Sequence, residues 1–300
     1  MAISLFEHNR SAYRAVREML EATGKAAVIH PTGTGKSFIG FKLCEDSQNS
    51  IICWLSPSDY IFRTQLENLK DSSPDTVLDN VKYFTYARLM NMTEDEIADI
   101  TPDYIVLDEF HRAGAEYWGA GVQKLLSAYP NAHLLGLSAT AIRYLDNMAD
   151  ELFDGNIASE MTLGEAIVRG ILNPPKYVLS IFSYQESFAK YEMRVKKTQN
   201  KAVRDKAEKY LEALRRTLDK AEGLDVIFNK HITDRTGKYI VFCANYDAML
   251  DAMGKVDEWF KYIDTEPHVY SVYSLDSASN KSFDDFRADN DDSHLRLLFC

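Results

Sequence analysis

The chain has 300 residues, 46% of them apolar and 26% charged, which is the composition of a globular protein and excludes collagen-like, mucin-like and disordered chains. At roughly 100–200 residues per domain, this length predicts two or three domains. No apolar run approaches the roughly 18–20 residues that span a bilayer, and the N-terminus lacks the apolar core of a secretory signal. We therefore expect a cytoplasmic protein without a membrane partner.

The charge is unevenly distributed along the chain. The net charge is −11, from 34 basic and 45 acidic residues. This charge argues against a protein that binds nucleic acid over most of its surface. Residues 1–182 carry 15 basic and 24 acidic residues (−9), residues 183–222 carry 11 and 7 (+4), and residues 223–300 carry 8 and 14 (−6). One basic segment thus separates two acidic ones.

Short apolar runs alternate with helical patterns over the first 172 residues. Strands are expected at 26–29, 51–55, 81–84, 104–107 and 133–137, with helices at about 36–44 and 60–69. Strands of four to six residues separated by helices form βαβ units, which predict a parallel sheet with helices on both faces.

A domain edge is expected where a helix over 162–171 meets Asn173-Pro174-Pro175, because two prolines cannot continue a helix. A strand at 177–182 and a helical stretch follow, and a polar break at 198–200 makes two helices likelier than one in that stretch. The final third alternates again, with strands at 239–242, 268–273 and 295–300 and helices near 247–253 and 282–287. We expect an ATP-binding domain over 1–175, a linker strand with a basic helical insertion over 176–236, and a partial second domain over 237–300.

The strongest motif follows the first strand and precedes a helix, and it reads His30-Pro31-Thr32-Gly33-Thr34-Gly35-Lys36-Ser37. Backbone N–H groups of such a glycine-rich loop surround phosphates, the lysine adds a cation and the serine offers a hydroxyl to Mg²⁺. The strict pattern begins with glycine, whereas His30 stands there. A surface turn with an incidental lysine is the other interpretation, and the strand–loop–helix context disfavours it.

Two further motifs end strands of the same sheet, where ligands of parallel α/β sheets bind. Asp108-Glu109-Phe110-His111 follows the strand at 104–107, and an aspartate there suits Mg²⁺ while Glu109 can position or deprotonate a water. Ser138-Ala139-Thr140 follows the strand at 133–137, although a turn or a helix N-cap would explain this tripeptide alone.

Together these motifs resemble motifs I, II (in its DExH form) and III of superfamily 2 DEAD/DEAH-box helicases, especially the bacterial proteins related to restriction-enzyme translocase subunits. The resemblance extends to a motif Ia-like loop with Ser56, Pro57, Arg63 and Gln65, a motif Ib-like loop with Thr85 and Tyr86, and a motif IV-like strand at 238–243.

The resemblance implies an α/β fold with a RecA-like P-loop domain, a helical insertion and a truncated second RecA-like domain, which clamp ATP and move along nucleic acid. It assigns ATP binding to Thr32, Gly33, Thr34, Gly35, Lys36 and Ser37, Mg²⁺ binding to Ser37 and Asp108, and catalysis to Lys36, Asp108, Glu109 and His111. Ser138, Ala139 and Thr140 would couple the nucleotide to nucleic acid, with DNA favoured over RNA. Ser56, Pro57, Arg63, Thr85 and Tyr86 would contact its backbone.

Two departures from the family pattern matter. Residues 6–11 lack the glutamine with which such proteins often recognise adenine, and no arginine-rich motif VI is present before residue 300. Arginine fingers contribute roughly 10³–10⁵ to turnover, so we expect this chain, as an N-terminal fragment, to bind ATP and hydrolyse it poorly.

Two interpretations stay open at this stage. The basic helical segment 183–222 could contact nucleic acid or a protein partner, but acidic residues interleave with the basic ones and favour a solvated helix face. As an alternative function, the chain could be a nucleotide-gated P-loop module that recruits a protein without translocating on nucleic acid. The oligomeric state is left undetermined.

Overall fold

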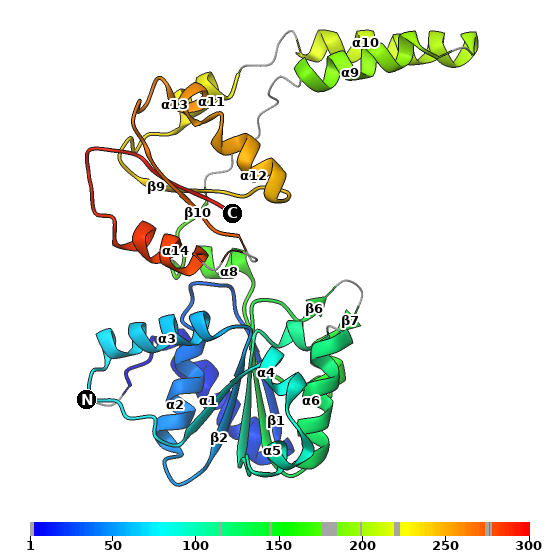
Figure 1. Cartoon of the computed structure of the whole chain (residues 1–300). Helices are drawn as coiled ribbons and strands as arrows, with labels where there is room; N and C mark the ends of the chain where they lie inside the picture. Colours follow the sequence, from blue (N-terminus) through cyan, green and yellow to red (C-terminus); the bar gives the residue numbers. More distant parts are fainter. Residues whose placement is uncertain are drawn as a thin grey trace. The chain divides into compact units, whose positions relative to one another are not determined.

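The computed structural model describes residues 3–114, 116–143, 146–175, 185–198, 200–218, 223–273, 276 and 278–300. The chain divides into two compact units, Met1–Pro175 and Lys176–Cys300 (Figure 1). The strand expected at 177–182 lies outside the described residues. Within these ranges, no helix has both the length and the apolarity needed to cross a bilayer.

The first unit is built on a parallel sheet of six strands in the spatial order β3-β2-β4-β5-β1-β8. Its strands are β1 (Lys25–Ile29), β2 (Ile52–Ser56), β3 (Val81–Thr85), β4 (Tyr104–Asp108), β5 (His133–Ser138) and β8 (Ile157–Glu160). The first five match the predicted strands within one residue at each end. The parallel sheet is therefore confirmed, and the sequence prediction missed only β8, which pairs with β1 at the sheet edge.

Helices cover both faces of this sheet. They are α1 (Glu7–Thr23), α2 (Ser37–Asp46), α3 (Asp59–Ser72), α4 (Tyr86–Asn91), α5 (Glu94–Ala98), the 3₁₀ helix η1 (Phe110–Gly114), α6 (Glu116–Ala128), α7 (Met148–Phe153) and α8 (Leu163–Val168). Two-residue strands β6 (Ile142–Arg143) and β7 (Asp146–Asn147) pair antiparallel. The helix predicted over 162–171 is shorter, because Gly170 leaves the helical conformation with φ of 68°.

Alternating side chains of the central strands divide the interior into two cores. Trp54 and Val106 pack with α1, α2 and α3 on one face, whereas Leu55 and Leu107 pack with α4 to α7 on the other. Successive strand residues point to opposite faces, so a strand buried on both sides is apolar throughout. This is why the strands appear in the sequence as unbroken apolar runs.

Because Gly136 in β5 has no side chain, the rings of Phe110 and Phe153 pack directly against the strand at this position. A Cβ atom at this position would lie 2.2 Å from Cζ of Phe153 and 2.9 Å from Cδ1 of Phe110. The rings of Phe110 and Phe153 lie with centroids 5.0 Å apart, and both are fully buried. Phe110 thereby anchors η1, which follows β4 directly, to the sheet.

The second unit contains a smaller parallel sheet in the order β10-β11-β9. Its strands are β9 (Lys238–Val241), β10 (His268–Ser271) and β11 (Arg296–Phe299), and its helices are α9 (Gln185–Lys196), α10 (Lys201–Leu218), α11 (Leu224–His231), α12 (Tyr246–Met253), α13 (Val256–Phe260) and α14 (Ser279–Ala288). The predicted break near residues 198–200 does separate two helices, α9 and α10.

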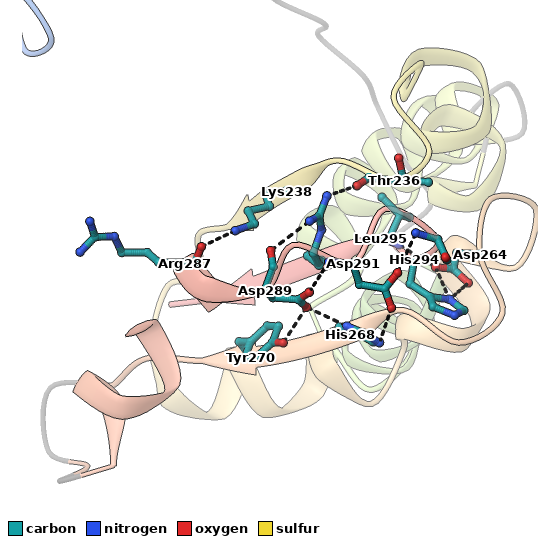
Figure 2. A network of polar contacts seen from close by, with 12 residues as sticks. Thr236, Lys238, Asp264, His268, Tyr270, Arg287, Asp289, Asp291, His294 and Leu295 are labelled. Carbon is teal, nitrogen blue, oxygen red and sulfur yellow. Dashed lines mark hydrogen bonds and ion pairs between the residues drawn. The ribbon is translucent and has the colours of Figure 1, made fainter. Parts of the chain in front are cut away.

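Asp289 is the centre of a polar network at the amino ends of these three strands (Figure 2). Its Oδ2 atom accepts a hydrogen bond from Tyr270 Oη at 2.8 Å and pairs with His268 Nδ1 at 2.7 Å, and its Oδ1 atom accepts from the Asp291 backbone N–H at 2.9 Å. Arg296 Nη1 donates to the Asp289 carbonyl at 3.0 Å. The network thus connects β10 and β11 with the loop after α14.

A second carboxylate continues this network. Asp264 accepts a hydrogen bond from the Leu295 backbone N–H at 2.7 Å and lies 3.3 Å from Nδ1 of His294. The His294 ring stacks on that of His268, with centroids 5.3 Å apart. Both connections that lead into β10 and β11 are therefore held by charged hydrogen bonds.

We predict that Asp289→Asn destabilises the second unit in a pH-dependent manner. Burial opposes the charged form of Asp289, but hydrogen bonds from His268, the Asp291 backbone and Tyr270 outweigh it and hold the pKa of the carboxyl well below its usual range. Such a group stabilises the fold above its unfolded pKa, about 3.9 for Asp, and this contribution is lost as the pH falls. The substitution should cost about 1–3 kcal/mol at pH 7.

The measurement is the free energy of local opening from hydrogen exchange at the β10 and β11 amides. The difference between variant and wild type should shrink as the pH falls from about 5 towards 3. Asp292→Asn, at an exposed neighbouring position, serves as the control and should have little effect. A difference that stays constant over this pH range would contradict the assignment.

Candidate nucleotide site

The glycine-rich loop joins the end of β1 to the start of α2. Gly33 and Gly35 adopt φ of 91° and 77°, in the left-handed region that favours glycine. Thr34 Oγ1 donates to the Pro31 carbonyl at 2.8 Å, and α2 begins at Ser37 directly after Lys36. The loop therefore closes tightly over the N-terminus of α2, which is the geometry that binds phosphates in other proteins.

An ion pair connects this loop to the end of β4. Lys36 Nζ lies 3.0 Å from Glu109 Oε1, and the two side chains are 8% and 22% exposed. Glu109 has φ of 53°, which is uncommon outside glycine and turns its side chain sharply away from the strand direction. The Lys36 and Glu109 side chains that the sequence singled out are thus in direct contact.

Glu109 is held in its charged form. Its burial opposes ionisation, yet the contact with His111 and the charge of Lys36 outweigh this effect and lower its pKa to about 2. His111 Nδ1 lies 3.4 Å from Glu109 Oε2. While it is paired in this way, Glu109 is a carboxylate of low basicity.

Ser138 joins the same group of residues from the end of β5. Its hydroxyl lies 2.7 Å from His111 Nδ1 and 3.5 Å from Glu109 Oε2, and it donates to the Thr140 carbonyl at 2.7 Å. Ser138 is fully buried, whereas Ala139 is half-buried and Thr140 exposed. Side chains from three separate loops therefore form one continuous set of contacts, which we call the Lys36–Ser138 network (Lys36, Glu109, His111 and Ser138).

Gln65 of α3 connects the two residues expected to bind Mg²⁺. Its Nε2 atom donates to Ser37 Oγ and to Asp108 Oδ2, both at 2.9 Å. Burial raises the pKa of Asp108 to about 6, although the hydrogen bond from Gln65 favours its charged form. Gln65 belongs to the motif Ia-like segment, and nothing in the residues around it indicates this bridging position.

The donor set fits a magnesium ion. Asp108 Oδ1 is buried and accepts no hydrogen bond from a described residue, so one oxygen of this carboxylate is available as a ligand. In the described part of the chain, no three His, Cys, Asp or Glu side chains gather into a metal site. One carboxylate and one hydroxyl, completed by water and phosphate oxygens, is an arrangement that Mg²⁺ commonly takes.

Two residues at the start of α1 support the loop, and the sequence patterns did not reveal either of them. Asn9 Nδ2 donates to the carbonyls of Thr34 and Gly35, at 2.9 and 3.2 Å, and His8 Nε2 lies 2.8 Å from the Thr34 carbonyl. Asn9 is 1% exposed and shares the buried face of α1 with Ala12 and Val16. The sequence did offer one signal for Asn9, since it is a polar residue on an otherwise apolar face of α1.

The residues expected to contact nucleic acid differ in solvent exposure: three are exposed or half-buried, and two are buried. Arg63 is exposed, and Pro57 and Thr85 are half-buried, with Thr85 Oγ1 capping α4 by accepting from the Arg88 N–H at 3.0 Å. Ser56 and Tyr86 are fully buried, so neither side chain is exposed for the expected contact with nucleic acid in this structure. Ser56 ends an interior strand, and Tyr86 extends into the core to donate to the Asp108 carbonyl at 2.9 Å.

Comparisons with known proteins agree with this geometry. Residues 65–143 match the family model of the type III restriction enzyme res subunit. The DEAH/RHA helicase HrpB of Escherichia coli is 13% identical, with a TM-score of 0.61 over 99% of this chain and 34% of that chain. The ATP-dependent type ISP restriction-modification enzyme LlaBIII, solved bound to DNA, is 14% identical, with a TM-score of 0.57 over 99% of this chain and 24% of that chain. No curated protein matches the sequence.

These matches show that the chain shares its fold with a helicase and a restriction-modification enzyme. The chain has the α/β fold of the RecA-like helicase core, as the resemblance predicted. It spans about a third of the length of the HrpB chain and about a quarter of the LlaBIII chain.

We predict that Tyr86→Phe affects stability and leaves nucleic-acid affinity unchanged. The substitution removes the hydroxyl that donates to the Asp108 carbonyl, which should lower the free energy of unfolding by about 1 kcal/mol. Denaturant unfolding measures the first effect and fluorescence anisotropy with labelled DNA the second. A clear loss of DNA affinity at unchanged stability would restore Tyr86 as a contact residue.

Proposed function

We propose that the chain forms the ATP-binding core of a nucleic-acid helicase or translocase that binds ATP with Mg²⁺ and hydrolyses it. The observation that carries this proposal is the Lys36–Ser138 network, in which the phosphate loop, the DEFH segment and the Ser138 loop make contact at one sheet edge. The family match and the fold support the same assignment.

In the proposed reaction, the triphosphate lies on the loop over 32–37, and its oxygens interact with the charged amino group of Lys36. Ser37 and Asp108 would hold Mg²⁺, which would neutralise charge at the phosphates. Phosphate oxygens compete with Glu109 for Lys36, which weakens the interaction that lowers the pKa of Glu109. Glu109 then becomes more basic, and in this proposal it orients a water molecule and accepts its proton.

The contacts of Ser138 support a coupling role for the segment over 138–140. Its hydroxyl contacts both His111 and Glu109 and also fixes the Thr140 carbonyl. A shift of Glu109 on nucleotide binding therefore acts directly on the loop after β5. We infer that this loop transmits the nucleotide state to the grip on nucleic acid.

Nucleic acid is the proposed substrate, with DNA favoured over RNA. The LlaBIII structure was solved bound to DNA, and the family match is to a restriction-enzyme subunit. In the first unit, Arg63, Pro57 and Thr85 remain as candidates for backbone contacts, which carry no sequence information.

Lys36→Ala and Glu109→Gln should separate binding from turnover. Loss of the lysine cation removes a main phosphate contact, so nucleotide affinity should fall about 10²-fold or more. Glu109→Gln keeps the shape of the side chain, so it should retain binding and lower turnover about 10²–10⁴-fold. Titration with a fluorescent ATP analogue and a phosphate-release assay measure the two effects. Equal losses of binding in both variants would contradict the division of roles.

Nucleic acid should stimulate ATP hydrolysis by the intact protein. The measurement compares turnover with single-stranded DNA, duplex DNA and RNA, and Arg63→Gln should weaken the response while Arg14→Gln, an exposed change on α1, should not. Absence of stimulation by all three would overturn the helicase or translocase assignment. ATP-dependent binding of a protein in that case would support the interaction module instead.

A further inference from the structure

The turn between α9 and α10 carries a concentrated positive charge. Residues 193–204, here called the hairpin tip, contain five basic residues and no acidic one: Arg194, Lys196, Lys197, Lys201 and Arg204. The last turn of α9 and the first turn of α10 meet there, whereas the start of α9 and the end of α10 lie at the other end of the hairpin (Figure 1).

Three acidic residues of the hairpin face the space between the two helices. Glu192, Glu208 and Glu212 line a hollow there, together with Lys196 of the tip and Arg215. Arg215 Nη2 lies 2.6 Å from Glu192 Oε1. These carboxylates thus face the neighbouring helix with Lys196 beside them, while the run over 193–204 itself contains no acidic residue.

The tip side chains are accessible to solvent. Arg194, Lys196, Lys197 and Lys201 are exposed and Arg204 is half-buried. None of the five forms an ion pair with a described residue. The solvated helix face favoured from the sequence accounts for this accessibility but not for the run of five cations without an acidic residue.

The backbone at the tip is ordered by local hydrogen bonds. Asn200 caps α10, since its Oδ1 accepts from the Val203 N–H at 3.3 Å and its carbonyl accepts from the Arg204 N–H at 3.0 Å. The first turn of α10 has no acidic residue and begins with Lys201. Cations at a helix N-terminus oppose the helix dipole, so the arrangement destabilises the helix unless an anion binds there.

We propose that the hairpin tip is a sequence-independent contact for the sugar–phosphate backbone of duplex nucleic acid. This proposal rests on the proposed function for the nature of the partner. A row of phosphates matches five clustered cations and a helix N-terminus, whereas the segments on either side carry −9 and −6 and repel a polyanion.

The test compares two triple variants of the intact protein. Lys196→Gln, Lys197→Gln and Lys201→Gln together remove three charges from the tip. Lys124→Gln, Lys230→Gln and Lys281→Gln remove the same charge from exposed positions on other helices. Affinity for a fluorescent DNA duplex of about three helical turns is measured by anisotropy at salt concentrations from about 50 to 200 mM.

The tip variant should bind less tightly than the wild type. The slope of log K against log salt should decrease by about 0.9 for each phosphate that the variant no longer neutralises, or roughly 2–3 in total. The control variant should keep the wild-type slope, and replacing the three tip lysines by arginine should restore it. Nucleotide affinity should be unchanged in all variants.

Equal slopes for the tip and control variants would overturn this proposal alone. Wild-type protein that fails to bind any duplex, in the presence or absence of nucleotide, would instead overturn the proposed function together with this contact.

Discussion

The ion pair between Lys36 and Glu109 is the interaction on which the candidate site depends. It joins the phosphate loop after β1 to the end of β4, and its two charges are largely removed from water. Deleting one member of such a pair leaves an uncompensated buried charge, which is strongly destabilising. Under the proposed function, a bound phosphate would replace Glu109 as the anion beside Lys36 and free Glu109 to accept a proton. Nucleotide binding and the protonation of Glu109 would then be linked through one lysine.

Gln65 has a comparable function on the other side of the loop. Its amide donates to Ser37 and Asp108 together, and a cation at this position would interact with the same two oxygens. The Gln65 Oε1 atom is buried and accepts no hydrogen bond from a described residue. These contacts with Ser37 and Asp108 make α3 part of the candidate site, although no catalytic residue was assigned to it.

Sequence patterns predicted the elements whose burial is uniform and missed those that depend on tertiary contacts. Strands β1, β2, β4 and β5 are apolar on both faces, which makes them visible as short runs. Strand β8 is half-buried and polar at Glu160, and it is defined by pairing with β1. Motif order likewise identified Lys36 and Glu109. Burial of Tyr86 and the bridging contacts of Gln65 depend on how α4 and α3 rotate against the sheet, which a single sequence does not specify.

The packing around Gly136 places a size limit on the motif itself. Phe110 stands between Glu109 and His111, and its ring and that of Phe153 fill the space that a side chain at residue 136 would need. The size of its side chain thus constrains Phe110, the third residue of the DEFH segment, whereas charge constrains Glu109 and His111. Alanine at 136 would need smaller residues at both 110 and 153, so the three positions should vary together among relatives even though none carries a reactive group. Such joint variation would show that core packing, and not only catalysis, constrains the residues of this motif.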